Sequence, residues 1–409
     1  MQQLEDVVRE EWGRLVALLL SQFRRLDLVE DALGDAVEAA SRTWPVDGAP
    51  DKPAAWLLTA ARRRVVDRLR TEAVARRKEP LLRTDAEHHQ EGARTMADAG
   101  SLVEDDVLRL VLMCAHPALA PESASALSLR LVLGVPTADI ARLFLVPEPT
   151  MAARLTRAKK RIVGAGIPFA VPDAEVLPER LDVVAQTAYL AFTAGYSPGT
   201  GPDLLRAGTS GEAIRLVRVV LGLRPDEPSL VALLALMLLQ HSRRDARARD
   251  GRLVLLADQD RARWHHDEVA EAVRLLARPS LAGPLSPLAA SYVVQARIAA
   301  EHATAPTAAD TRWDRIVGLY DVLLQVAPSP SARLARAVAV AEHHGTAAGL
   351  AALEGIDIPA SHRPAAVRAE LLSRAGDLDA ARAAYDQAIA ACRNDVERDF
   401  LERQREELG

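Results

Sequence analysis

The sequence predicts an all-α protein. Alanine, leucine and arginine, which are strong helix formers, are abundant, whereas only 4% of the 409 residues are aromatic. Apolar residues recur at spacings of three and four along most of the chain, as one buried face of a helix requires. Glycine and proline interrupt this pattern and mark the ends of helices. The length is enough for about three mostly helical domains.

The N-terminal segment, MQQLEDVVREEW, is acidic and lacks the apolar core of a signal peptide. No apolar run reaches the ~18 residues that a membrane span needs. We therefore expect a cytoplasmic protein with no membrane partner. Cys114 and Cys392 are far apart and belong to no CxxC motif, so we expect neither a disulfide nor a cysteine zinc site. Cys114 is expected to be a small buried residue.

A break and then a basic helix follow the first helices. Residues 44–56, WPVDGAPDKPAAW, contain three prolines and a glycine, which predict an interruption of the helical pattern after Trp44. Residues 55–70 then form a helix with an apolar stripe. That stripe consists of Leu58, Ala61, Val65 and Leu69.

Basic charge is concentrated on the helix predicted at residues 55–70 and just after it. Between residues 62 and 78 there are eight basic and two acidic residues, although the whole chain has a net charge of -5. Arginines beside an aromatic ring are suited to single-stranded or partly melted nucleic acid, because bases stack while phosphates are neutralised. For Trp56, a role as core anchor is the more common alternative. The candidate binding residues are Trp56, Thr59, Arg62, Arg63, Arg64, Asp67 and Arg70.

Residues 71–104 lack a sustained apolar period and predict a linker. Extended, it would reach ~110 Å at ~3.3 Å per residue, so the segments on its two sides can bind sites that lie far apart. The helix expected at 105–113 and the apolar run at 124–133 then support a third element.

That third element, residues 137–162, predicts a helix-turn-helix. In its second helix, Met151, Leu155, Ala158 and Ile162 share one face. Thr137 is a candidate cap for the first helix. For the basic second helix, the alternative interpretation is a surface helix with a solvated basic face. The opposite face is small and cationic, as a helix that enters the major groove requires. Its candidate DNA-binding residues are Thr150, Ala153, Arg154, Arg157, Lys160 and Arg161.

The order WxxxxARRRVVDRLR, linker, TMAARLTRAKKRI resembles bacterial sigma factors of the extracytoplasmic-function (ECF) type, within the sigma-70 family. LVEDALGDAVEAASRTW at 28–44 is similar to the helix with which that family docks on core polymerase. The resemblance assigns 5–77 to sigma region 2, 78–104 to a flexible linker and 105–166 to sigma region 4. It implies a protein that binds core RNA polymerase and directs promoter-specific transcription initiation, without a cofactor.

The resemblance also implies roles for single residues. The basic helix and the loop before it would open and read the −10 element, including its melted strand, with a flipped base held in the 44–56 loop. A plain interhelical turn is the alternative interpretation of this loop. Thr150, Ala153, Arg154 and Arg157 would read the −35 element in double-stranded promoter DNA. Most of the family has asparagine where Arg63 stands and a basic residue where Ala152 stands, so the promoter sequence does not carry over. The residues expected to face core polymerase are Asp27, Glu30, Asp31 and Asp35.

Such sigma factors end near residue 166, whereas this chain continues with a further helical region, 175–409. Three segments within it, beginning at Ala213, Ile316 and Ala381, share the spacing of a tetratricopeptide-type (TPR-like) helix. In the second and third of them, Tyr320 and Tyr385 stand at its aromatic position. We expect a degenerate array of helical hairpins that modulates activity in cis. Its concave surface would contact an intramolecular or protein partner.

Residues 245–264 in this region are dense in charge. Together with YLAFTAGY at 189–196, they resemble the signature segments of a sigma-factor subgroup with a C-terminal helical extension. The candidate groove residues are Asp258, Gln259, Asp260, Arg261 and Trp264. The alternative is that these charges form pairs that brace adjacent helices.

Enzymatic and metal-dependent functions are not expected. The histidine clusters at 265–266 and 343–344 place adjacent residues ~100° apart on a helix, where they cannot easily share a metal. HExxH, P-loop and GxSxG motifs are absent from the sequence. The alternative function is a helix-turn-helix transcriptional regulator that acts without polymerase and senses a ligand or peptide through its helical domain.

Overall fold

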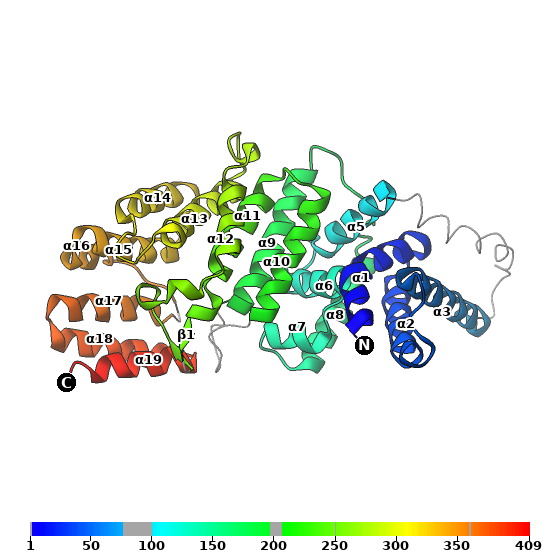
Figure 1. Ribbon diagram of the computed structural model, residues 1–409, viewed down its shortest axis with the longest axis horizontal. Coiled ribbons are helices and arrows are strands. Elements are labelled where there is room, and N and C mark those ends of the chain that lie inside the picture. Colours follow the sequence, from blue (N-terminus) through cyan, green and yellow to red (C-terminus); the bar gives the residue numbers. More distant parts are fainter. Residues whose placement is uncertain (1, 77–99, 197–206, 250, 360) are drawn as a thin grey trace. The chain divides into compact units, whose positions relative to one another are not determined.

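The computed structural model (Figure 1) describes residues 2–76, 100–196, 207–249, 251–359 and 361–409. Within them the chain is all-α, as predicted, and the strands are one short antiparallel pair, β1 (Ala248–Arg249) and β2 (Arg252–Leu253). The chain divides into two compact units: unit 1 comprises Met1–Leu190 and Gly222–Arg224, and unit 2 comprises Ala191–Leu221 and Pro225–Gly409. Of the predicted linker, residues 77–99 lie outside the described residues.

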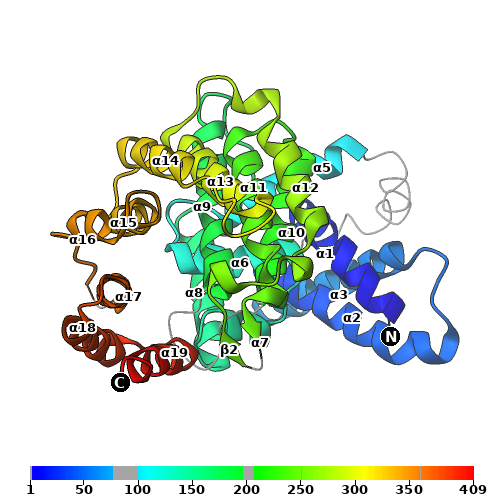
Figure 2. The same cartoon turned by 60° about the vertical axis from the view of Figure 1, so that its left-hand side comes forward.

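Unit 1 contains the segments assigned by resemblance to sigma regions 2 and 4. Helix α1 packs against α2 and α3 on one side and against α5 and α6 on the other, so both segments contribute to one packed unit (Figures 1 and 2). Its helices are α1 (Gln2–Phe23), α2 (Leu26–Asp47), α3 (Pro53–Arg76), α5 (Gly100–Cys114), α6 (Pro121–Leu133), α7 (Thr137–Leu143), α8 (Glu148–Gly164) and the first part of α9 (Leu177–Tyr196).

Close contact between α1 and α6 depends on a glycine. A Cβ atom added to Gly13 would lie 2.4 Å from the carbonyl oxygen of Val132, too close for any side chain without a shift of the backbone. Trp12 is buried beside it, and the Arg130 guanidinium lies 5.5 Å from the centre of its ring. This geometry fixes α1 on α6 at short range.

Several helix ends differ from the sequence prediction. Helix α2 continues through Pro45 to Asp47, two residues beyond the proline, and Gly48 then ends the helix with a positive φ of 86°. Helix α5 begins at Gly100 instead of residue 105. Thr137 does not cap α7: the N-cap is Pro136, and Thr137 is the first helical residue.

Unit 2 is a succession of helices in which, from α13 to α19, each packs against the next (Figures 1 and 2). Ala213, Ile316 and Ala381, the first residues of the three repeat segments, are fully buried, and Gly376 forms the left-handed turn between α17 and α18. The helices are the end of α9, α10 (Ala207–Leu223), α11 (Pro228–His241), α12 (His266–Leu276), α13 (Pro287–Thr304), α14 (Trp313–Val326), α15 (Pro330–His344), α16 (Thr346–Ala352), α17 (Arg363–Ala375), α18 (Leu378–Ala391) and α19 (Asp395–Glu406), with 3-10 turns η1 (Arg244–Ala246), η2 (Leu256–Asp258), η3 (Arg261–Arg263) and η4 (Pro279–Leu281).

None of the described helices combines the length and the apolar character that crossing a bilayer demands.

Candidate nucleic-acid interface

Helix α8 separates an apolar from a basic face as the sequence predicted. Its four buried residues are the predicted ones, Met151, Leu155, Ala158 and Ile162, each no more than 5% exposed. They pack α8 against α6 and α7. The burial of one complete face fixes the direction in which the opposite face points.

The basic face of α8 has no acidic partner among the residues that the structure describes. Thr150, Ala153, Arg157, Lys160 and Arg161 are exposed, and Arg154 is half-buried. Among the described residues, no Asp or Glu lies within ion-pair distance of the four cationic side chains: Arg154, Arg157, Lys160 and Arg161. A cationic surface without internal neutralisation binds phosphates and releases their counterions, which is the electrostatic requirement for DNA binding.

A tight turn sets the angle between α7 and α8. Leu145 has a φ of 55° in the turn, and the Val146 amide donates to the carbonyl of Ala141. Ile140 and Leu143 bury the inner face of α7. The result is a helix-turn-helix whose second helix presents small residues and cations at its exposed side, the arrangement with which such motifs enter the major groove.

Glu30 differs from the expectation of an outward-facing carboxylate. It is only 6% exposed and accepts hydrogen bonds from Arg130 Nε at 2.6 Å and from Lys159 Nζ at 2.7 Å. Burial raises the pKa of Glu30, but the charges of Arg130 and Lys159 outweigh it and hold that pKa below its ordinary value. The carboxylate therefore joins α2 to α6 and α8 instead of being presented to a partner.

Sequence reasoning missed this three-residue contact, although two signals were present. Arg130 is a lone charge within the apolar run 124–133, and Lys159 directly follows the buried Ala158. A cation that flanks an apolar face needs a nearby anion when it is partly buried. The acid had to come from a distant segment, which the sequence alone does not reveal.

The other three acids of α2 remain accessible. The side chains of Asp27, Asp31 and Asp35 are 58%, 64% and 44% exposed. Asp35 accepts from Arg68 of α3 at 2.6 Å, and Asp31 lies 3.5 Å from the same guanidinium. The three carboxylates form a surface acidic row that is partly neutralised by Arg68 of α3 and by Arg25, which pairs with Asp27 at 2.8 Å.

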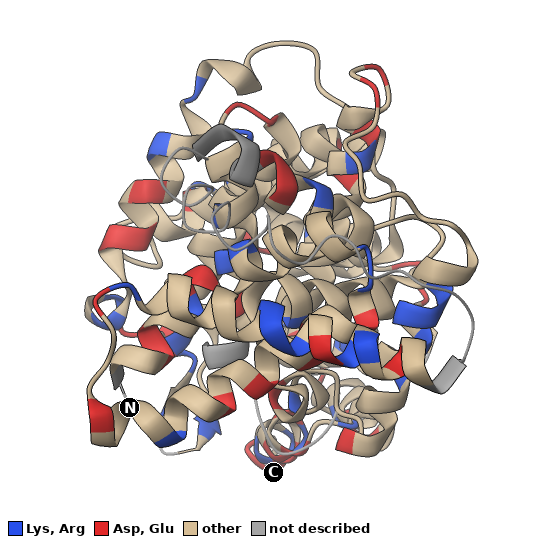
Figure 3. Ribbon diagram, turned by 90° about the vertical axis from the view of Figure 1, so that its right-hand side faces the viewer, with Lys and Arg blue, Asp and Glu red and all other residues tan. Residues whose placement is uncertain are grey.

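The predicted −10 helix, α3, has a mixed surface. Thr59, Arg63, Asp67 and Arg70 are exposed, whereas Arg62 and Arg64 are half-buried. Acidic and basic residues lie interspersed on the N-terminal helices in Figure 3. Unlike α8, this helix carries an acid within its own basic face, because Asp67 lies 3.6 Å from Arg70. Arg77 and Lys78, which contributed to the predicted basic run, lie outside the described residues.

Trp56 packs against Trp44, the last residue before the proline-rich segment. The two rings meet edge to face with their centres 5.6 Å apart. Trp44 is 8% exposed and Trp56 is half-buried, which supports the alternative of a core anchor for Trp56. The fully buried residue of this turn is Leu57 and not Leu58, so the buried stripe begins one residue earlier than predicted.

The candidate groove in unit 2 separates into exposed acids and a structural arginine. Asp258 and Asp260 are exposed, and Asp260 accepts from the Ala262 amide to start η3. Arg261 donates to the carbonyls of His302 and Ala305 at the end of α13. Arg261 also lies 4.5 Å from the ring centre of the buried Trp264. Arg261 thus braces the fold through backbone carbonyls and not through the carboxylates that the alternative interpretation expected. Gln259 is buried, and its side-chain amide donates to the carbonyl of Val254.

Two polar clusters in unit 2 were not found from the sequence. Arg244 donates to Glu268 at 2.9 Å and to Nδ1 of His265, so His265 belongs to an ion network. In the second cluster, the ligand-type atoms of His362, Cys392 and Glu397 lie within 4.8 Å of one another. Glu397 is already engaged there, 3.3 Å from His362 and 3.8 Å from Arg363, and the guanidinium disfavours a cation at this position.

Comparisons with known proteins agree with the helix-turn-helix. Residues 109–162 match the model of sigma-70 region 4, and residues 180–280 match a family of unknown function, DUF6596. An uncharacterized protein of Rhizobium meliloti (strain 1021) is 41% identical over 401 residues, which cover 96% of this chain and 92% of that protein. The chain belongs to the same family as this protein, and its residues 109–162 are similar to region 4 of sigma-70 proteins. No solved structure matches it.

Proposed function

We propose that this chain is a sigma factor that binds core RNA polymerase and directs promoter-specific initiation, with unit 2 modulating its activity in cis. The observation that carries the proposal is α8, a region 4 helix with one fully buried face and an opposite basic face that pairs with no acid in the described part of the chain. Small Thr150 and Ala153 at its start allow close approach to base edges, while Arg154 and Arg157 follow one and two turns later. We assign this surface to the −35 element.

Helix α3 supports the second half of the proposal. Arg62 and Arg63 have no acidic partner among the described residues, and Thr59 lies exposed beside them. Together with the turn at Gly48 between α2 and α3, they form the surface that we assign to the −10 element and its melted strand. Two DNA-binding surfaces in this order are the ECF arrangement, and core polymerase places such a protein in the cytoplasm.

The exposed acids of α2 are the residues that we propose to contact core polymerase. Asp27, Asp31 and Asp35 form an accessible row, and we assign them to the polymerase contact. Glu30 joins this row only if α2 separates from α6 and α8. Binding of core enzyme and promoter would therefore compete with the Glu30 ion pairs.

Run-off transcription with purified core polymerase tests the proposal. Initiation at a defined promoter should depend on this protein, and Arg154→Gln with Arg157→Gln should abolish it. Arg333→Gln, an exposed arginine on α15, is the control with the same charge change and should act as the unaltered protein does. Promoter-specific initiation by core enzyme alone, or full activity of the double variant, would reject the sigma assignment.

The alternative, a regulator that acts without polymerase, has one observation in its favour. The basic face of α8 is already exposed while Glu30 is buried. DNA binding by α8 therefore does not need a polymerase contact with the acids of α2. Mobility-shift assays without polymerase separate the two. A polymerase-independent regulator would bind its site tightly and specifically alone, whereas a sigma factor gains specificity only with core enzyme.

A truncation tests the role of unit 2. Cutting after residue 180 would remove Val184 and Ala188 from the core of unit 1, as well as Thr187, whose carbonyl accepts from Ser125. A chain that ends after Tyr196 keeps helix α9 intact. We expect its transcriptional activity in cells to differ from that of the full chain. Unchanged activity at equal protein level would mean that unit 2 has no role in cis.

A further inference from the structure

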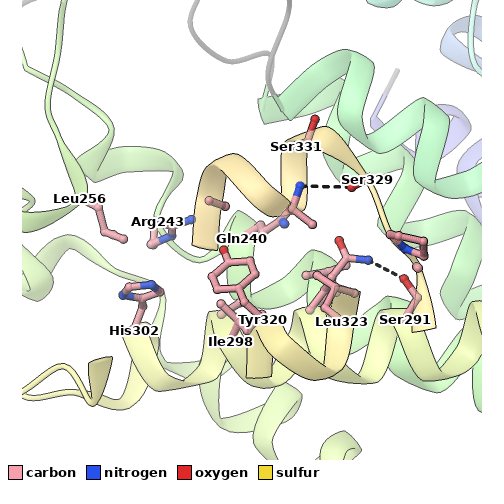
Figure 4. Close-up of a pocket in the computed structure, with 17 residues that line it drawn as sticks. Gln240, Arg243, Leu256, Ser291, Ile298, His302, Tyr320, Leu323, Ser329 and Ser331 are labelled. Carbon is pink, nitrogen blue, oxygen red and sulfur yellow. Dashed lines mark hydrogen bonds between the residues drawn. The ribbon is translucent and has the colours of Figure 1, made fainter. Parts of the chain in front are cut away.

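A cavity in unit 2 is lined by helices α11, α13, α14 and α15 (Figure 4). Its volume is about 580 Å³, which falls within the ~300–1,000 Å³ of pockets that hold small molecules. Its middle is apolar, with Leu236, Ile298 and Leu323 among the lining residues. Polar side chains converge on it from all four helices or the turns that follow them.

The charge of the lining is positive. Arg243 is half-buried at one end, beside His302 in Figure 4, and its Nη2 donates to the hydroxyl of Tyr196 at 3.0 Å. Among the described residues, no Asp or Glu lines the cavity or pairs with Arg243. A partly buried guanidinium that donates one hydrogen bond to a tyrosine hydroxyl has further donors available for an anion.

The remaining polar groups are neutral and partly unused. No described group hydrogen-bonds the hydroxyl of Tyr320 or the amide of Gln240, and Figure 4 shows both side chains between Arg243 and Leu323. Burial raises the pKa of Tyr320 to about 12, and burial together with Arg243 and Arg261 lowers the pKa of His302 to about 4. At neutral pH both are uncharged, so Arg243 supplies the charge of the lining.

We propose that this cavity binds a small amphiphilic anion, with a carboxylate or phosphate head at Arg243 and an apolar body between Ile298 and Leu323. Helix α15 begins at the cavity with Ser331 and Ala332, and the positive end of its dipole adds to the preference for an anion. Tyr320 and Gln240 supply hydrogen bonds beside the head. The ligand would give unit 2 a chemical signal, a property that goes beyond the sigma function proposed above.

The test is calorimetric titration of the full chain with four probes of one chain length: octanoate, octyl phosphate, octanol and octylammonium. We expect at least one of the two anions to bind at least about tenfold more tightly than octanol, and octylammonium not to bind. The stronger of the two anions identifies the head group. Equal binding of all four probes, or none by either anion, would overturn the proposal.

Variants locate the site. Arg243→Gln should weaken binding of the preferred anion at least about tenfold, and Arg243→Lys should retain much of it. Tyr320→Phe should weaken it about threefold, because a neutral hydrogen bond is lost without a change of shape. Arg333→Gln removes the same charge from the exposed side of α15 and should leave the affinity unchanged. Unaltered binding by a folded Arg243→Gln variant, checked by its unliganded melting curve, would place the anion elsewhere.

Discussion

Replacing Glu30 by glutamine tests the contact that joins α2 to region 4. The substitution keeps the shape of the side chain and removes the charge that Arg130 and Lys159 share at 2.6 and 2.7 Å. Breaking a buried ion pair costs about 3–5 kcal/mol, because the partner charge stays buried. The two cations are 22% and 21% exposed and so regain some water, which brings the expected loss to about 2–3 kcal/mol.

Differential scanning calorimetry and hydrogen exchange measure this loss. In a unit of this size, about 2–3 kcal/mol lowers the Tm by about 4–12 °C. Exchange should accelerate in α2, α6 and α8 but not in unit 2. The matched control is Glu38→Gln on the same helix. Its carboxylate is 66% exposed in a pair with Arg42, a surface contact of at most about 1 kcal/mol.

The pH dependence gives a second check with a fixed sign. The folded-state pKa of Glu30 lies below its ordinary value, so its contribution is fully present above the unfolded pKa of about 4.3 and is lost as pH falls through the folded pKa. The difference between wild type and Glu30→Gln should be full at neutral pH and shrink in acid. If Glu30→Gln destabilised no more than Glu38→Gln, or if the difference were the same at every pH, the ion pairs would not hold the two regions together.

Three further predictions concern single positions. Arg157→Gln should reduce the slope of log affinity against log salt for promoter DNA by about one, and an unchanged slope would show that this arginine contacts no phosphate. Gly13→Ala should destabilise unit 1 by about 1–3 kcal/mol, because the added Cβ meets the Val132 carbonyl. The control Gly34→Ala in α2 adds a Cβ in open space and should stabilise slightly. Equal melting temperatures of the two variants would contradict the close approach of α1 to α6. Because the folded pKa of His302 is about 4, unit 2 should keep its full stability above pH ~6.5 and lose about 3 kcal/mol as pH falls towards 4. His302→Phe should remove this loss of stability in acid. A variant that loses as much stability in acid as wild type would assign the loss to other groups.

The local pattern of the sequence was sufficient where burial follows helical period. The four buried residues of α8 were predicted without error, since one helix face against one core is decided within the segment. Prediction failed where a distant segment decides the outcome. The sequence of α2 alone predicts Glu30 as an exposed acid. It is buried because Lys159, which lies in the distant helix α8, packs against it and donates a hydrogen bond to it. The end of α2 was misplaced because proline was treated as a break, whereas α2 runs two residues past Pro45.

The position of Lys159 connects these observations. It lies between the buried and the basic face of α8, and its ammonium points to Glu30 while its neighbour Lys160 points to solvent. Lys159 is therefore paired with Glu30 while α2 is packed on region 4. Under the proposed function, separation of α2 from α8 would release Lys159 for a contact with phosphate. Under the proposed function, opening exposes an acid on α2 to polymerase and a base on α8 to DNA in the same step. Polymerase and promoter would then favour the open arrangement cooperatively, because each stabilises one of the two charges that separation leaves unpaired.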